Sequence, residues 1–109
     1  MDDKKPKKIL LSGVKPTGRP HIGNYFGAMK QFVELQDKYH GFIFVADYHA
    51  LTTLQNPEEL KKNTSDIVLD YLAIGLDPDK TVIFKQSDVP EVTELAWIFN
   101  CITDTMKKR

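Results

Sequence analysis

The chain has 109 residues, and its 15 Lys and Arg residues balance its 15 Asp and Glu residues to a formal net charge of zero. This length suits a single domain, and the balanced charge argues against a nucleic-acid binder that relies on a strongly basic surface. The single cysteine, Cys101, excludes an internal disulfide framework and a cysteine-based metal cage. No apolar run approaches the roughly 18 residues of a membrane span, and no signal peptide is recognisable, so we predict a cytoplasmic protein without membrane association.

The first half of the chain predicts a strand and a helix after a charged tail. Residues 1–8 carry a lysine cluster and are expected to be a solvated tail. Residues 9–11 form a short apolar run that stops at a turn, which indicates a buried strand. Two prolines and a glycine make residues 14–20 a loop. Over residues 22–39 apolar side chains recur at three- and four-residue steps, which predicts an amphipathic helix capped by Gly41.

The second half repeats the strand and helix pattern twice. Residues 42–46 are continuously apolar, which is typical of a strand covered on both faces of a parallel sheet. Asn56-Pro57 followed by two acids predicts the start of a helix that ends near Gly75. Residues 81–84 predict a third strand, and residues 91–103 a third helix. The residues expected to be buried on these two helices are Leu60, Ile67, Val68, Tyr71, Leu72 and Ile74, and then Leu95, Trp97, Ile98, Phe99, Cys101 and Ile102.

The resulting order, β-α-β-α-β-α, predicts an α/β fold with parallel strands joined by right-handed crossovers. It corresponds to one Rossmann-like half of a doubly wound nucleotide-binding sheet. Ligands of such sheets bind at the carboxyl ends of the strands. Three loops are therefore the expected places for a site, namely residues 12–23, 47–53 and 86–90.

The first of these loops carries the most informative residues. It reads Gly13-Val14-Lys15-Pro16-Thr17-Gly18-Arg19-Pro20-His21-Ile22-Gly23-Asn24, and it matches neither the phosphate loop nor the dinucleotide-binding motif. His21 and Asn24 flank Gly23 near the predicted start of a helix, where backbone N–H groups favour anions. Gly23 lets a flat adenine or ribose approach the backbone. His21 can donate to a phosphate whose negative charge grows in the transition state.

This loop resembles the first signature of the class I aminoacyl-tRNA synthetases, spelled here His21-Ile22-Gly23-Asn24. Its longer form, from Pro16 to Tyr25, is similar to the version found in tryptophanyl-tRNA synthetases. Further stretches match that family in the same order, and the resemblance covers residues 8–102. These stretches are Gly27-Ala28 with Gln31-Phe32-Val33, the segment Ala46-Asp47-Tyr48-His49-Ala50-Leu51-Thr52, residues 71–78, and Gln86-Ser87-Asp88-Val89-Pro90.

The resemblance implies an enzyme that activates tryptophan with ATP and ligates it to tRNA(Trp) in protein synthesis. It implies an ATP site built from Lys15, Pro16, Thr17, Gly23 and Asn24. It also implies that Mg²⁺ accompanies ATP and is held mainly by the phosphates.

Catalytic roles are implied for His21, near the phosphates, and for Lys15 and Thr17. The amino-acid pocket is implied to be bordered by Leu11, His49 and Asp47. No protein-bound metal is expected, because the three histidines lack metal-ligand spacing.

The second signature of the family, a loop that holds the pyrophosphate, is not found in the chain. The resemblance therefore implies that residues 9–109 are the first half of a catalytic domain, incomplete relative to the family. The full-length enzyme is expected to be a homodimer. The fragment alone is expected to be inactive or to bind only ATP, and to self-associate because a partial sheet leaves apolar surface uncovered.

Three alternative functions remain open at this point. One is the related tyrosyl-tRNA synthetase, which has the same fold. Another is a small nucleotidyltransferase with an H-x-G-H loop, although Asn24 stands at the last position of that motif. The third is a non-catalytic nucleotide-binding or interaction module.

Overall fold

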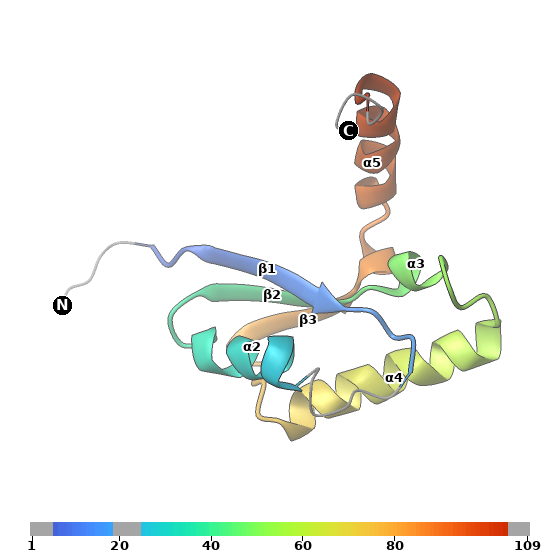
Figure 1. The fold of residues 1–109 in the computed structure, drawn as a ribbon. Coiled ribbons are helices and arrows are strands. Elements are labelled where there is room, and N and C mark those ends of the chain that lie inside the picture. The colour runs from blue at the N-terminus through green and yellow to red at the C-terminus, as the bar shows by residue number, and fades with distance from the viewer. Residues whose placement is uncertain (1–5, 19–24, 105–109) are drawn as a thin grey trace.

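The computed structural model describes residues 6–18 and 25–104 of the chain. Within these ranges the strands form one parallel sheet in the order β1-β2-β3 (Figure 1). This arrangement confirms the predicted α/β fold with parallel strands, a partial Rossmann-like sheet. The elements in chain order are β1 (Ile9–Val14), η1 (Tyr25–Met29), α2 (Lys30–Leu35), β2 (His40–Val45), α3 (Asp47–Ala50), α4 (Pro57–Ala73), β3 (Thr81–Lys85), η2 (Gln86–Asp88) and α5 (Glu91–Ile102).

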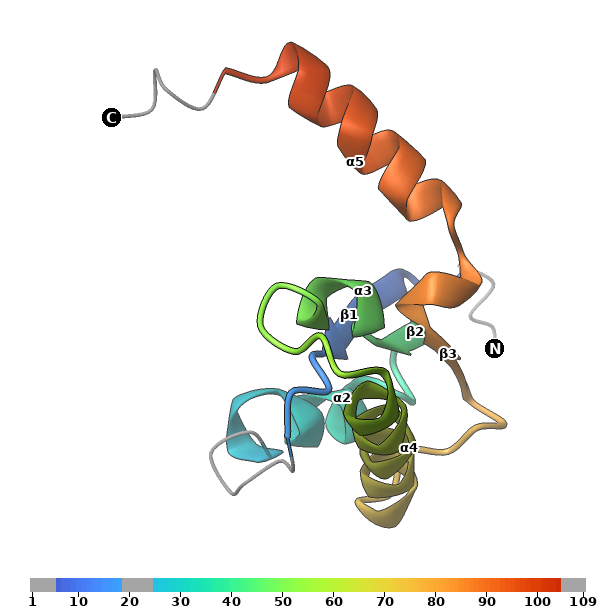
Figure 2. The ribbon, with the colours of Figure 1, turned by 90° about the vertical axis from the view of Figure 1, so that its right-hand side faces the viewer.

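Helices α2 and α4 cover the same face of the sheet, and the core lies beneath them (Figures 1 and 2). Each fully buried apolar side chain stabilises the fold by about 1.5–3 kcal/mol relative to an exposed one, so this face supplies most of the stability. The buried core residues are Met29, Phe32, Ile43, Val45, Ile67, Tyr71 and Leu76.

The opposite face of the sheet is only partly covered, contrary to the prediction for residues 42–46. Ile43 and Val45 are buried, whereas Phe42 and Phe44 are half-buried. Side chains alternate across a strand, so this alternation shows that one face of β2 is packed and the other is not. The rings of Phe44 and Phe84 lie side by side on the open face, with centroids 5.7 Å apart.

Helix α5 was expected to bury an apolar side, and this expectation is wrong. The helix projects away from the sheet (Figures 1 and 2), and none of its residues is buried. Trp97 is 69% exposed, and Cys101, expected in the core, is also exposed. The apolar pattern correctly predicts a helix with a side that favours burial. It does not predict which other surface would cover that side.

The first helical region is shorter than predicted. It consists of η1, a single π-helical segment, and α2, and it ends at Leu35. The predicted start at Ile22 lies outside the described residues. Gly41 does not cap the helix but lies in β2, where an added Cβ would come within 3.2 Å of Thr81 Cγ2. The absence of a side chain therefore serves strand packing at this position.

Helix α4 begins as its sequence predicts. Asn56 Oδ1 accepts a hydrogen bond from the Glu59 N–H at 3.0 Å, and Pro57 takes the first helical position. Gly75, with φ of 110°, ends the helix in a backbone conformation that favours glycine. Of the residues expected on its buried side, Leu72 is 43% exposed, so the predicted stripe was too wide.

A buried glutamine attaches the end of α4 to α2. Gln36 is 8% exposed, and its Nε2 donates to the Gly75 carbonyl at 3.1 Å. Its Oε1 accepts from the Asp77 N–H at 2.8 Å. One amide side chain thus satisfies two backbone groups of the turn before β3, which fixes where β3 begins.

Tyr71 is expected to make the fold sensitive to alkaline pH. Burial raises the pKa of its phenol well above the ordinary value of 10.0. The unfolded chain ionises this phenol near the ordinary value, so its contribution to stability is complete below pH 10 and is lost as the pH rises toward the folded pKa. Urea unfolding should show the free energy of unfolding falling above pH 10. In Tyr71→Phe, which cannot ionise at this position, the fall should be smaller, and equal slopes would contradict the prediction.

Candidate functional site

The segments that follow the three strands meet at one end of the sheet (Figure 1). Lys15 follows β1, Asp47 follows β2, and Gln86 follows β3. Parallel strands place their carboxyl ends at one edge, so residues distant in sequence come together there. The described parts of the three predicted loops therefore lie in one region of the molecule. These loops are residues 12–23, 47–53 and 86–90.

Asp47 joins the end of β2 to the end of β3. Its Oδ1 accepts from the N–H groups of Tyr48 and Ser87, both at 3.0 Å, and its Oδ2 accepts from Ser87 Oγ at 2.5 Å. The side chain is half-buried. A carboxylate that accepts three hydrogen bonds is held in one orientation, so Asp47 acts as a clamp between α3 and η2. The loop predicted at 47–53 begins with this short helix.

His49 is held by its backbone. Its N–H donates to Gln86 Oε1 at 3.1 Å, and its carbonyl accepts from Thr52 Oγ1 at 2.9 Å. The side chain is exposed. The imidazole is therefore accessible at the carboxyl edge of the sheet while its main chain is attached to η2.

The residues of the first loop are described in part. Lys15 is half-buried, Pro16 is fully buried and Thr17 is exposed. The buried proline anchors the segment, and the two polar residues on either side of it remain accessible. The other predicted members of the ATP site and of the catalytic set, His21, Gly23 and Asn24, lie outside the described residues.

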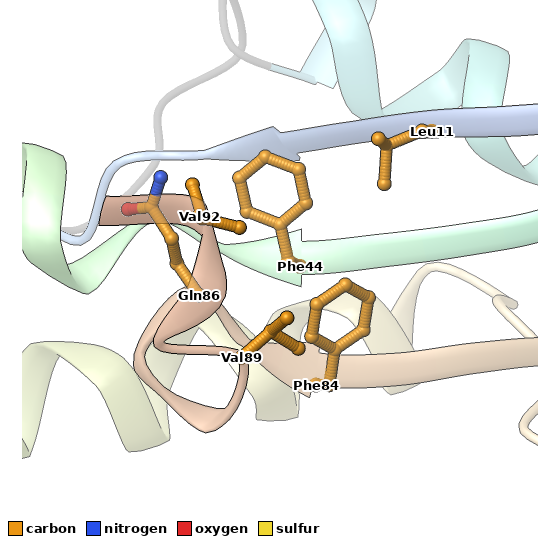
Figure 3. Close-up of a pocket in the computed structure, with 6 residues that line it drawn as sticks. All are labelled: Leu11, Phe44, Phe84, Gln86, Val89 and Val92. Carbon is orange, nitrogen blue, oxygen red and sulfur yellow. The ribbon is translucent and has the colours of Figure 1, made fainter. Parts of the chain in front are cut away.

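An apolar cavity of about 230 Å³ opens on the less covered face of the sheet (Figure 3). Leu11, predicted to border the amino-acid pocket, lies in its wall and is 64% exposed. Aromatic rings from β2 and β3 form the floor. The lining residues are Leu11, Phe44, Phe84, Gln86, Val89 and Val92.

A second, more polar cavity of about 380 Å³ lies between α4 and the ends of β2 and β3. Asp47 lines this second cavity, whereas Leu11 lines the first. Two of the three residues predicted for the amino-acid pocket, Leu11 and Asp47, thus line different cavities. The other residues that line the second cavity are Pro57, Leu60, Lys61, Thr64, Ser65 and Lys85.

Gln86 and Ser87 are the residues of this edge to which the sequence assigned no role. The loop at 86–90 was singled out, but no feature of it marked individual contacts to Asp47 and His49. Both contacts join the end of one strand to the end of another. The spacing of residues within a short stretch of sequence does not predict contacts of this kind. The one sequence feature that could have indicated a role for Gln86 was its position directly after a predicted strand.

Residues 6–18 and 25–104 contain no group of three or more His, Cys, Asp and Glu side chains that could hold a metal ion. In the same ranges no helix is both long enough and apolar enough to span a bilayer.

Comparison with known proteins identifies the family. The family model described as tRNA synthetases class I (W and Y) matches residues 3–109. The chain is 67% identical over 96 residues to the tryptophan–tRNA ligase of Fusobacterium nucleatum, which is 88% of this chain and 30% of that protein. The chain thus belongs to the class I tRNA synthetases of the tryptophan and tyrosine group.

Solved structures agree with this assignment. The tryptophanyl-tRNA synthetase of Campylobacter jejuni complexed with ADP and tryptophan is 47% identical, with a TM-score of 0.80 over 89% of this chain and 30% of that one. The Mycoplasma pneumoniae tryptophanyl-tRNA synthetase is 39% identical, with a TM-score of 0.85 over 90% and 28%. Within the family, the chain corresponds to the N-terminal catalytic region of the tryptophanyl-tRNA synthetases. It spans about 30% of the length of the curated relatives it matches.

Proposed function

We propose that the chain serves ATP-dependent activation of tryptophan and its ligation to tRNA(Trp), in the cytoplasm, as the first half of a catalytic domain over residues 9–109. The observation that carries this proposal is the 67% identity to a tryptophan–tRNA ligase. In the reaction a tryptophan carboxylate oxygen attacks the α-phosphorus of ATP and pyrophosphate leaves. A hydroxyl of the tRNA then displaces AMP from the activated carboxyl group.

The described residues support this chemistry in distinct ways. Lys15 and Thr17 are accessible after β1, where their donors can meet phosphate oxygens. We propose that His21, Gly23 and Asn24 complete the ATP site. We propose further that Leu11, Asp47 and His49 border the amino-acid pocket, with Leu11 in the wall of the apolar cavity.

We propose that magnesium enters this site together with ATP. The carboxylate of Asp47 already accepts three hydrogen bonds, and the described ranges contain no cluster of metal ligands. Mg²⁺ commonly keeps its waters and binds through substrate phosphates, and when bound it neutralises phosphate charge. The full-length enzyme is proposed to act as a homodimer.

The nucleotide site can be tested in the 109-residue chain by calorimetric titration with Mg·ATP. Hydrogen bonds to charged groups contribute about 1.5–3 kcal/mol, so His21→Ala and Asn24→Ala should each weaken ATP binding about tenfold or more. Matched controls are His40→Ala, at the start of β2, and Asn100→Ala in α5, both exposed and neither in a segment that directly follows a strand. Unchanged ATP affinity in both loop variants would favour a non-catalytic module.

Specificity is tested by comparing amino acids in the same titration. L-tryptophan should bind more tightly than L-tyrosine, and the reverse order would favour the tyrosyl enzyme. The chain alone should support little tryptophan-dependent exchange of pyrophosphate into ATP, because it spans about 30% of its relatives. Exchange at the rate of a full-length relative would contradict this expectation.

A further inference from the structure

The second, more polar cavity has two lysines in its lining, Lys61 and Lys85. Lys61 belongs to α4, and Lys85 is the last residue of β3, so two elements distant in sequence each contribute one ammonium group. Helix α4 begins at the end of the sheet where the strands end (Figure 1). The cavity therefore holds two positive charges near the carboxyl edge of the sheet.

Neither of these ammonium groups has a close counter-ion. Within residues 6–18 and 25–104, Lys61 forms no ion pair, and Lys85 Nζ lies 4.0 Å from Asp88 Oδ1, which is too far for a hydrogen bond. The neighbouring Lys62 does not line the cavity and pairs with Asp66 at 3.0 Å. A cleft lined by cations without close partners attracts an anion.

The remaining polar groups of the lining are compatible with a bound anion. The carboxylate of Asp47 already accepts three hydrogen bonds, from the Tyr48 N–H and from the N–H and hydroxyl of Ser87, so its negative charge is largely compensated. The hydroxyl of Ser65 has no partner within the described ranges and can donate. The cavity thus offers an anion two cations and a hydroxyl donor.

We infer that this cavity binds a backbone phosphate near the 3′ end of tRNA(Trp), with Lys61 and Lys85 as its cationic contacts. The inference rests on the proposed function and adds a binding site to it. Lysine commonly binds phosphate as a point charge. At about 380 Å³ the cavity has the size of a small-ligand site, and Pro57 and Leu60 provide apolar surface that a ribose or a base can contact.

The position of the cavity agrees with what the reaction requires of the tRNA. A terminal hydroxyl of the tRNA must reach the activated carboxyl group, and ligands of parallel sheets bind at the carboxyl edge. The phosphates next to that hydroxyl must therefore lie near the same edge. Among the described residues, none from the loop after β1, where we propose that ATP binds, lines this cavity. The cavity is thus a second place for phosphate at this edge.

The test titrates the 109-residue chain with a short fluorescent single-stranded RNA that ends in CCA, and it follows the anisotropy at several salt concentrations. Each phosphate neutralised on a single strand adds about 0.7 to the slope of log affinity against log salt. Lys61→Gln and Lys85→Gln should each lower this slope by about that amount and weaken binding about threefold or more at low salt.

The matched control is Lys62→Gln. It removes the same charge from the next position of α4, but Lys62 pairs with Asp66 and does not line the cavity. Both the slope and the affinity should therefore change much less than in Lys61→Gln. Equal effects of the two substitutions would show a non-specific attraction to the surface and would overturn the inference.

Competition at constant ionic strength identifies the source of the phosphate. Pyrophosphate should displace the RNA only weakly, because it cannot make the ribose and base contacts. If pyrophosphate displaced the RNA fully and lost affinity in Lys61→Gln, the cavity would be a site for free phosphate, and the assignment to RNA would be overturned. Weaker binding of Mg·ATP in Lys61→Gln would likewise show that the cavity serves the nucleotide.

The outcomes separate this inference from the proposed function. If Mg·ATP and L-tryptophan bind as proposed but the RNA is insensitive to Lys61→Gln and Lys85→Gln, the function stands and the phosphate site is overturned. If neither Mg·ATP nor L-tryptophan binds while the RNA depends on Lys61 and Lys85 and not on Lys62, the proposed function fails and the phosphate site stands.

Discussion

Replacing Tyr71 with alanine is expected to lower the free energy of unfolding by about 3–5 kcal/mol, the range for loss of a large buried aromatic side chain. Tyr71 is completely buried under the sheet, and its ring packs edge-on against Phe32 with centroids 6.2 Å apart. Its hydroxyl donates to the Phe44 carbonyl at 2.9 Å. Alanine would leave a cavity, lose the aromatic pair and remove a donor from a carbonyl of the central strand. Urea unfolding followed by circular dichroism measures the change.

The matched control is the next residue along α4. Leu72 is 43% exposed, so Leu72→Ala removes a side chain that makes fewer packed contacts and should cost about 1 kcal/mol or less. Similar losses for Leu72→Ala and Tyr71→Ala would show that the helix does not pack on the sheet through the face described above.

Replacing Asp47 with alanine should lower the free energy of unfolding by about 2–3 kcal/mol, which is the range for one hydrogen bond to a charged group, because water can replace part of the three bonds at this half-buried site. The substitution removes the acceptor of three hydrogen bonds and leaves the Ser87 N–H without its partner. The contact between α3 and η2 should loosen in consequence. Amide hydrogen exchange measures this directly, with faster exchange expected at Ser87.

The control for this variant is Asp37→Ala. The Asp37 carboxylate is exposed and pairs with Lys80 at 2.7 Å, which lowers the pKa of Asp37. Exposed ion pairs contribute little, so Asp37→Ala should leave both the unfolding curve and the exchange of Ser87 nearly unchanged. If Asp47→Ala behaved in the same way, its carboxylate would not be a clamp between the two strand ends.

Local signals predicted the parts of the fold that depend on local chemistry. The Asn56 cap, the glycine that ends α4 and the apolar runs of the strands all involve residues close to one another in sequence. The exposure of α5 and the open face of β2 depend on which other surfaces are present. Apolar composition predicted that both would be covered. It indicates that a side chain favours burial, but it does not indicate which other surface buries it.

The site was predictable to the level of its loops. The carboxyl-edge rule for parallel sheets located the three segments before any contact was known. The individual contacts were not predictable, because Asp47 and Ser87 lie 40 positions apart and His49 and Gln86 lie 37 apart. Such pairs form only when the sheet register brings two strand ends together. The sequence around one residue of a pair therefore does not predict the other residue.

The strand order β1-β2-β3 has a consequence for how the chain is assembled during synthesis. Within residues 6–18 and 25–104, β2 pairs with β1 and β3 pairs with β2, so none of these three strands has to be inserted between two that have already paired. The slow step is the closure of each long parallel crossover, because loop entropy must be overcome before the pairing contributes stability. These three strands can therefore pair in the order in which they leave the ribosome, with β2 on β1 before β3 is added.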